Sequence, residues 1–141
     1  MKNLREKFFA EGEVLFMGYS SRAPQFSNSI YNAFTNAGIR VYPLNPKTSE
    51  KYNVKVYHDL SELLKIPSVA YILMNNENAK TAVQQLKNYG VKKIMFHRGK
   101  TADQTLLNEC KDAGIETAVA CPLMLFGSGI HKIHACLAGV K

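Results

Sequence analysis

The sequence predicts an α/β fold: a Rossmann-like, doubly wound, parallel five-stranded sheet with helices on both faces, in three α/β/α layers. Short apolar runs of strand length alternate with longer segments whose apolar residues recur at helical spacing. Three helical segments end at a glycine (Gly38, Gly90 and Gly114), and a β-branched residue that opens a strand follows each one. Since strands that alternate with helices are joined by right-handed crossovers, the sheet they build is parallel.

The first third of the chain provides a helix, a strand, a second helix and a second strand. Residues 2–10 place apolar side chains one helical turn apart, and residues 14–17 are a continuous apolar run typical of a strand covered on both faces. Residues 28–37 carry apolar side chains at helical spacing. The strand over residues 39–44 follows and ends at an Asn-Pro pair.

The rest of the chain continues this alternation. After a loop over residues 47–53 and a short extended piece over residues 54–57, Asp59 begins a helix that Pro67 closes. The segments expected next are strand 68–73, helix 77–89, strand 91–97, helix 102–113 and strand 115–120. Residues 130–137 are read as a short terminal helix.

Size and composition describe one cytoplasmic domain. The 141 residues form a single domain (1–141), with a core over about residues 12–122 and a C-terminal extension over residues 123–141. The charged start has no apolar h-region, and no apolar run approaches the roughly 20 residues of a membrane span. Three widely spaced cysteines form no disulfide framework, so reduced thiols and a cytoplasmic location are expected.

The carboxyl ends of the strands meet at one rim of a parallel sheet, where open α/β folds bind their ligands. The segments that follow these strands hold small residues, amides and cations, and no carboxylate. Gly18 ends an apolar strand just before a helix, where a glycine lets the backbone approach a phosphate closely. We expect cofactor-binding residues at Gly18, Tyr19, Ser20, Ser21, Arg22, Asn45, Pro46, Lys47, Asn75, His97, Gly99 and Cys121.

Structural roles compete with ligand roles at several of these positions. Ser20 and Ser21 suit a phosphate contact or a turn cap, and Asn45 suits a nucleotide contact or an Asn-Pro turn. The loop that begins at His97 suits a pyrophosphate contact or an exposed turn. No partner in the sequence identifies Cys121 as a nucleophile, so its burial is expected.

No catalytic or metal site is predicted. His131, His134 and Cys136 form a tempting trio of ligands, but no second cysteine pair gives the spacing of a zinc site. The formal charge of +7 favours an anionic partner. Because the basic residues are spread along the chain without a Lys/Arg block, nucleic acid is not expected.

The strand ends also argue against NAD. NAD-binding folds place Gly-x-Gly-x-x-Gly after the first strand and an acid after the second, which holds the ribose diol. Here Gly18 is the single glycine of the first turn, and the second strand ends in Asn45. The hydroxyls and the nearby cations Arg22, Arg40 and Lys47 suit an extra phosphate, as in NADP or the 3′-phosphate nucleotide of coenzyme A.

Several segments resemble the small bacterial CoA-binding-domain proteins. The matching segments are residues 18–20 with Pro24, residues 38–46, residues 54–57 and the Cys121-Pro122 pair. The resemblance extends over about residues 14–122 and implies a Rossmann-type fold related to the CoA-binding domain of succinyl-CoA synthetase. It implies nucleotide binding across Gly18, Ser20, Asn45 and the ends of the later strands.

The chain also departs from that family's pattern. Phe26 stands where the family often has lysine, and a usual glycine is replaced near Ser27. His97 stands in place of glutamine, and Ala120 in place of arginine.

The expected function is the binding of coenzyme A or an acyl-CoA, without catalysis by this chain; NADP is a less favoured cofactor. One alternative is an NADP-linked oxidoreductase or a fragment of an acyl-CoA ligase. Another is a regulatory or interaction module that has kept the fold and lost the ligand, which the departures at Phe26 and Ser27 motivate. The expected partner is a small nucleotide, with no membrane or nucleic acid, and a homodimer stays open.

Overall fold

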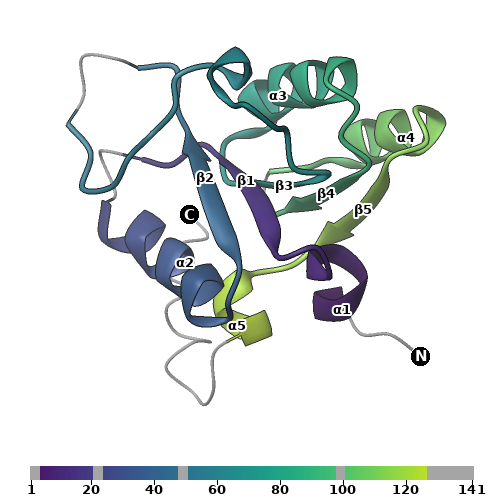
Figure 1. The fold of residues 1–141 in the computed structure, drawn as a ribbon. Coiled ribbons are helices and arrows are strands. Elements are labelled where there is room, and N and C mark those ends of the chain that lie inside the picture. The colour runs from purple at the N-terminus through teal and green to yellow at the C-terminus, as the bar shows by residue number, and fades with distance from the viewer. Residues whose placement is uncertain (1–3, 21–23, 48–50, 98–100, 127–141) are drawn as a thin grey trace.

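The computed structural model describes residues 4–20, 24–47, 51–97 and 101–126 (Figure 1). The strands are β1 (Glu13–Met17), β2 (Arg40–Leu44), β3 (Val69–Ile72), β4 (Lys93–Phe96) and β5 (Glu116–Val119). The helices are α1 (Leu4–Phe9), α2 (Pro24–Asn36), α3 (Asn76–Asn88), α4 (Gln104–Asp112) and α5 (Pro122–Phe126), with one 3₁₀ turn, η1 (Leu60–Glu62). None of the helices in this part of the chain has the length and apolar character that crossing a bilayer requires.

The five strands form one parallel sheet in the order β2-β1-β3-β4-β5, as the sequence predicts. Strand order reverses between β1 and β3, which is the switch point where doubly wound sheets bind ligands. The register aligns the carboxyl ends, because Met17 pairs with Leu44 on one side and with Ile72 on the other. The loops after β1, β2 and β3 therefore leave the sheet side by side.

Helices cover both faces of the sheet, which confirms the predicted three layers (Figure 1). Side chains alternate along β1: Leu15 contributes to the core beneath α3, α4 and η1, and Phe16 to the core beneath α1, α2 and α5. The second core is rich in aromatic rings. The Phe34 ring of α2 packs edge-on against Phe9 and Tyr71, with centroids 5.3 and 5.7 Å away.

Two helix predictions need correction. The helix expected from Asp59 to Pro67 is a single 3₁₀ turn, because Leu63 already has extended backbone angles. Its start is capped as expected: the Ser61 N–H donates to the Asp59 carboxylate, and the Asp59 N–H donates to the Glu62 carboxylate. Helix α2 begins at Pro24 instead of residue 28, since proline suits the first position of a helix.

Helix α5 is absent from the sequence prediction, which ended the last strand at residue 120 and treated residues 123–141 as a C-terminal extension. Proline again occupies the first helical position, and the Phe126 ring lies 5.5 Å from that of Phe34 on α2. The described residues after Pro122 therefore pack on the domain core. The helix expected over residues 130–137 lies outside the described residues.

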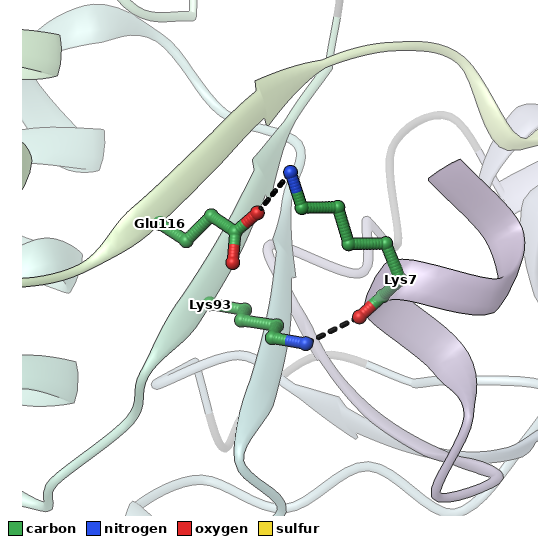
Figure 2. A network of polar contacts seen from close by, with 3 residues as sticks. All are labelled: Lys7, Lys93 and Glu116. Atoms are coloured by element: carbon green, nitrogen blue, oxygen red, sulfur yellow. Dashed lines mark hydrogen bonds and ion pairs between the residues drawn. The ribbon is translucent and has the colours of Figure 1, made fainter. Parts of the chain in front are cut away.

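A small polar network joins α1 to the amino ends of β4 and β5 (Figure 2). Lys7 Nζ lies 2.6 Å from Glu116 Oε2, and Lys93 Nζ donates to the Lys7 carbonyl oxygen. Because both members of the ion pair are exposed, we expect Glu116→Gln to lower the free energy of unfolding by less than about 1 kcal/mol. Urea unfolding measures this loss. The difference from wild type should shrink in 1 M NaCl, and a loss above about 2 kcal/mol would contradict this assignment.

Candidate functional site

A cavity of about 570 Å³ opens at the carboxyl ends of β1, β2 and β3, beside the switch point. Three parts of the chain line it: the strand ends with their loops, residues 58–60, and one face of α3. Of the predicted binding residues, the structure brings six together here: Gly18, Ser20, Asn45, Pro46, Lys47 and Asn75.

The lining combines apolar side chains with a polar, uncharged helix face. Met17, Leu44 and Leu60 belong to the buried core and also border the cavity. Helix α3 contributes the exposed residues Asn78, Thr81 and Gln85. Their separations of three and four residues place them on one face of the helix. An apolar surface next to amide and hydroxyl groups suits a flat group that forms hydrogen bonds at its edges.

Gly18 sets the shape of the turn after β1. Its φ is +94°, and a Cβ atom at this position would overlap the Leu73 carbonyl oxygen. The N–H groups of Gly18 and Tyr19 both donate to the Leu44 carbonyl oxygen, at 3.0 and 3.3 Å. The Ser20 N–H donates to the buried Ser27 Oγ at 3.0 Å. The close approach that Gly18 makes in this structure is thus to the backbone that follows β3, and these N–H groups hold the turn in place.

Asn45 connects three segments around the cavity through hydrogen bonds. Its Nδ2 donates to the Tyr19 carbonyl oxygen at 2.8 Å, and its Oδ1 accepts the Lys47 N–H at 3.0 Å. Its backbone N–H donates to the Tyr57 carbonyl oxygen at 2.9 Å. The side chain therefore shapes the Asn-Pro turn, which is one of the two roles that the sequence leaves open.

Replacing Asn45 by alanine removes both side-chain hydrogen bonds and should lower the free energy of unfolding by roughly 1–3 kcal/mol. Asn45→Asp keeps an acceptor for the Lys47 N–H but sets an oxygen against the Tyr19 carbonyl oxygen. We therefore expect the aspartate variant to be no more stable than the alanine variant. Urea unfolding at neutral pH compares the two, and an aspartate variant as stable as wild type would refute this role for Nδ2.

His58 and Asp59 line the cavity, although the sequence pattern did not select them. Tyr57 forms a parallel bridge to Leu44, and its N–H donates to the Pro43 carbonyl oxygen at 2.8 Å. This pairing brings the next two residues to the end of β2. The signal in the sequence was the short extended piece expected over residues 54–57, which had no predicted neighbour.

Asp59 supplies a carboxylate that the strand ends alone do not. Hydrogen bonds from the Ser61 hydroxyl and then from the Ser61 N–H lower the pKa of this carboxyl group, which stays ionised at neutral pH. The cavity therefore includes one acid beside β2.

Three predicted residues lie elsewhere. Tyr19 is buried on the α2 side of the sheet, where its hydroxyl donates to Asn53 Oδ1 at 2.7 Å, and burial raises the pKa of its phenol. His97 is also buried on that side, with Nδ1 2.7 Å from the Tyr71 hydroxyl. Cys121 is buried, as expected, and borders a separate cavity of about 240 Å³ beside α5.

Arg40 needs correction as a cation near the site. It is the first residue of β2, so it lies at the amino end of the strand, while the cavity lies at the carboxyl end. Ser21, Arg22 and Gly99 lie outside the described residues, as do His131, His134 and Cys136. Within the described ranges, no group of three or more His, Cys, Asp or Glu side chains is arranged to hold a metal ion.

Comparison with solved structures supports the fold. A conserved hypothetical protein from Pyrococcus furiosus is 19% identical with a TM-score of 0.65, and the match covers 86% of this chain and 97% of that protein. Prb, the PH1109 protein redesigned for binding, is 21% identical with a TM-score of 0.72, and the match covers 97% of this chain and 91% of Prb. A Thermus thermophilus structure, cell-free ID.343, is 14% identical with a TM-score of 0.70, and the match covers 82% of this chain and 89% of that protein.

No curated protein matches the chain. The model of one protein family, described as a CoA binding domain, matches residues 13–126. That range includes all five strands and every residue that lines the cavity. The chain therefore belongs to the CoA-binding-domain family.

Proposed function

We propose that the chain binds coenzyme A or an acyl-CoA, holds its nucleotide part in the cavity at the ends of β1, β2 and β3, and carries out no reaction of its own. The observation that carries this proposal is the cavity itself, which lies at the switch point of a sheet that belongs to this family. We also propose a cytoplasmic location, in keeping with the free thiol of Cys110.

The lining fits a nucleotide in size and in chemistry. The cavity volume of about 570 Å³ is in the usual range of small-molecule sites. The apolar core side chains suit the face of a base, and Asn78, Thr81 and Gln85 suit its polar edges and the ribose hydroxyls. Lys47 and the start of α3, capped by Asn75, suit a phosphate. When bound, coenzyme A would supply a thiol that carries acyl groups.

Asp59 favours a second candidate, a nucleotide whose ribose diol is free. A carboxylate near the end of the second strand accepts hydrogen bonds from such a diol, as in NAD-binding folds. Coenzyme A carries a phosphate on the 3′-hydroxyl of this diol, whereas the diol is free in dephospho-CoA and NAD. The ligand panel below separates the two candidates.

A thermal-shift panel of coenzyme A, acetyl-CoA, dephospho-CoA, NAD and NADP tests the proposal. A ligand present at about 100 times its Kd adds roughly 2.7 kcal/mol of stability, which raises Tm by several degrees in a domain of this size. We expect this shift with coenzyme A or acetyl-CoA. A larger shift with dephospho-CoA and NAD would favour the second candidate, and no shift with any CoA species would refute the proposal.

A further inference from the structure

Strand β5 forms an open edge of the sheet (Figure 1). Among the described residues, β4 is the only strand that pairs with it. The N–H groups of Glu116 and Ala120 donate to carbonyl oxygens of β4 and of the residue before it, at 2.9 and 3.0 Å. Because backbone groups alternate in direction along a strand, the N–H and C=O groups of Thr117 and Val119 point away from β4. Such a row of outward groups is a template for another strand.

The opposite edge of the sheet, at β2, is blocked. Pro43 has no N–H to offer, and its carbonyl oxygen accepts the Tyr57 N–H at 2.8 Å. Arg40 adds an exposed charge at the start of the strand. Proline, charge and a covering segment are usual means of preventing pairing at an edge. Residues 117–120 have neither proline nor charge, and no described segment other than β4 pairs with β5.

The surface along β5 is also apolar enough to be covered. Val119 keeps 48% of its surface exposed. Beyond the strand, the cavity of about 240 Å³ bordered by Val119, Met124 and Leu125 extends this apolar surface to α5. Two copies of a chain with a formal charge of +7 repel one another, so a segment without charge is where they can approach at the least electrostatic cost.

The edge is complementary to itself. In an antiparallel pair around a two-fold axis at Ala118, Thr117 lies opposite the partner's Val119, and Val119 lies opposite the partner's Thr117. Both residues direct their backbone groups outward, so these two pairs exchange roughly four hydrogen bonds. Glu116 then faces the partner's Ala120, so no like charges meet. A register with Thr117 opposite the partner's Thr117 forms about half of these bonds within β5.

We propose that β5 is a self-association surface, through which two copies of the chain join their sheets into one continuous sheet around a two-fold axis. The interface is centred on one short strand, so it belongs to the small and reversible class, with a Kd on the order of 100 µM. The larger cavity lies at β1, β2 and β3, away from this edge, so the inference does not depend on ligand binding.

Sedimentation velocity from about 10 µM to about 1 mM tests the association, and wild type should form a reversible dimer. Val119→Lys brings two ammonium groups into the interface and should raise the Kd roughly tenfold or more. Thr117→Pro removes an outward N–H, keeps the bonds to β4 and should weaken the dimer as well. Gln84→Lys, exposed on α3 and away from this edge, is the matched control and should leave the Kd within about twofold.

Thermal unfolding checks that each variant is folded. A wild type that stays monomeric at about 1 mM, or a Val119→Lys variant that dimerises as wild type does, would overturn the proposal.

A cysteine on the axis tests the register. The Cα atoms of Ala118 and the partner's Ala118 would lie about 4.5 Å apart, which is within the range that a disulfide spans. Under mild oxidation with diamide, Ala118→Cys should form a covalent dimer much faster than Gln84→Cys, with wild type as the measure of cross-linking through the native cysteines. Cross-linking that is no faster at Ala118 than at Gln84 would contradict this pairing.

Hydrogen exchange separates a second copy from any other occupant of the edge. Protection of the Thr117 and Val119 amides should rise with protein concentration, because the partner is another copy of the chain. Equal protection at all concentrations would mean that another part of the same chain covers the edge, and it would overturn the proposal.

Discussion

Replacing Gly18 by alanine is expected to lower the free energy of unfolding by about 3 kcal/mol or more. The backbone at this position has a φ of +94°, which costs an L-residue roughly 1–2 kcal/mol. The added Cβ atom would also overlap the Leu73 carbonyl oxygen, which belongs to the backbone and cannot rotate away. Relief requires the turn after β1 to separate from the connection that follows β3, and both line the cavity. Urea or thermal unfolding measures the loss.

Gly90→Ala is the matched control. Gly90 has a φ of +80°, close to that of Gly18, but a Cβ atom there would meet no atom within 4 Å. Gly90→Ala should lower the free energy of unfolding by roughly 1–2 kcal/mol, which is the cost of the positive φ alone. The excess loss in Gly18→Ala measures the contact with Leu73. Equal losses in the two variants would contradict the close packing between these two loops.

Replacing Thr81 by tryptophan is expected to weaken coenzyme A binding roughly a hundredfold or more while the fold is kept. Thr81 is exposed on α3 and lines the cavity, so an indole there takes up space that the ligand needs. Threonine and tryptophan have similar helix propensities, and the position lies outside the buried core. Calorimetry measures the Kd, and thermal unfolding checks that the variant is folded.

Gln84→Trp supplies the control on the same helix. Gln84 is exposed and does not line the cavity, so a tryptophan there should leave the Kd within about twofold of wild type. If Thr81→Trp binds coenzyme A as well as Gln84→Trp does, the ligand does not occupy this cavity.

The strands were predictable because the signals for them are local. The run from Val14 to Met17 is apolar without interruption, and it belongs to β1, an interior strand with a neighbour on each side. Gly90 ends α3 with a positive φ, as its place between a helical segment and a strand predicts. Such signals need only a few neighbouring residues, so the sheet could be predicted from the sequence.

The composition of the cavity wall was not fully predictable, because it depends on contacts between distant segments. His58 and Asp59 reach the site through the bridge between Tyr57 and Leu44, which are 13 residues apart in the sequence. No local pattern states which strand a short extended piece will join.

The face of the sheet explains why two predicted residues, His97 and Tyr19, lie away from the cavity. Phe96 contributes to the core beneath α3 and α4, so the next residue, His97, points to the α2 side. Alternation would put Tyr19 on the same face as Met17, but the chain turns at Gly18, whose φ is positive, and Tyr19 joins the opposite core. The sequence correctly places both His97 and Tyr19 at the carboxyl end of a strand. It does not predict to which face of the sheet each side chain points.

Two departures from the family pattern prove to be neighbours. The ring of Phe26 packs edge-on against that of His97, with centroids 5.5 Å apart, on the α2 side of the sheet. Neither residue lines the cavity. The departures at Phe26 and His97 therefore lie on the other face of the sheet from the cavity.

A titration with coenzyme A followed by ¹H–¹⁵N NMR tests the central claim most directly. The side-chain amides of Asn75, Asn78 and Gln85 and the backbone amides of Gly18 and Lys47 all belong to residues that line the cavity. We predict that these signals shift together and saturate with one Kd, while those of residues bordering the smaller cavity near Cys121 stay in place. Signals that do not move at millimolar coenzyme A, or shifts confined to residues outside the cavity, would contradict the proposed site.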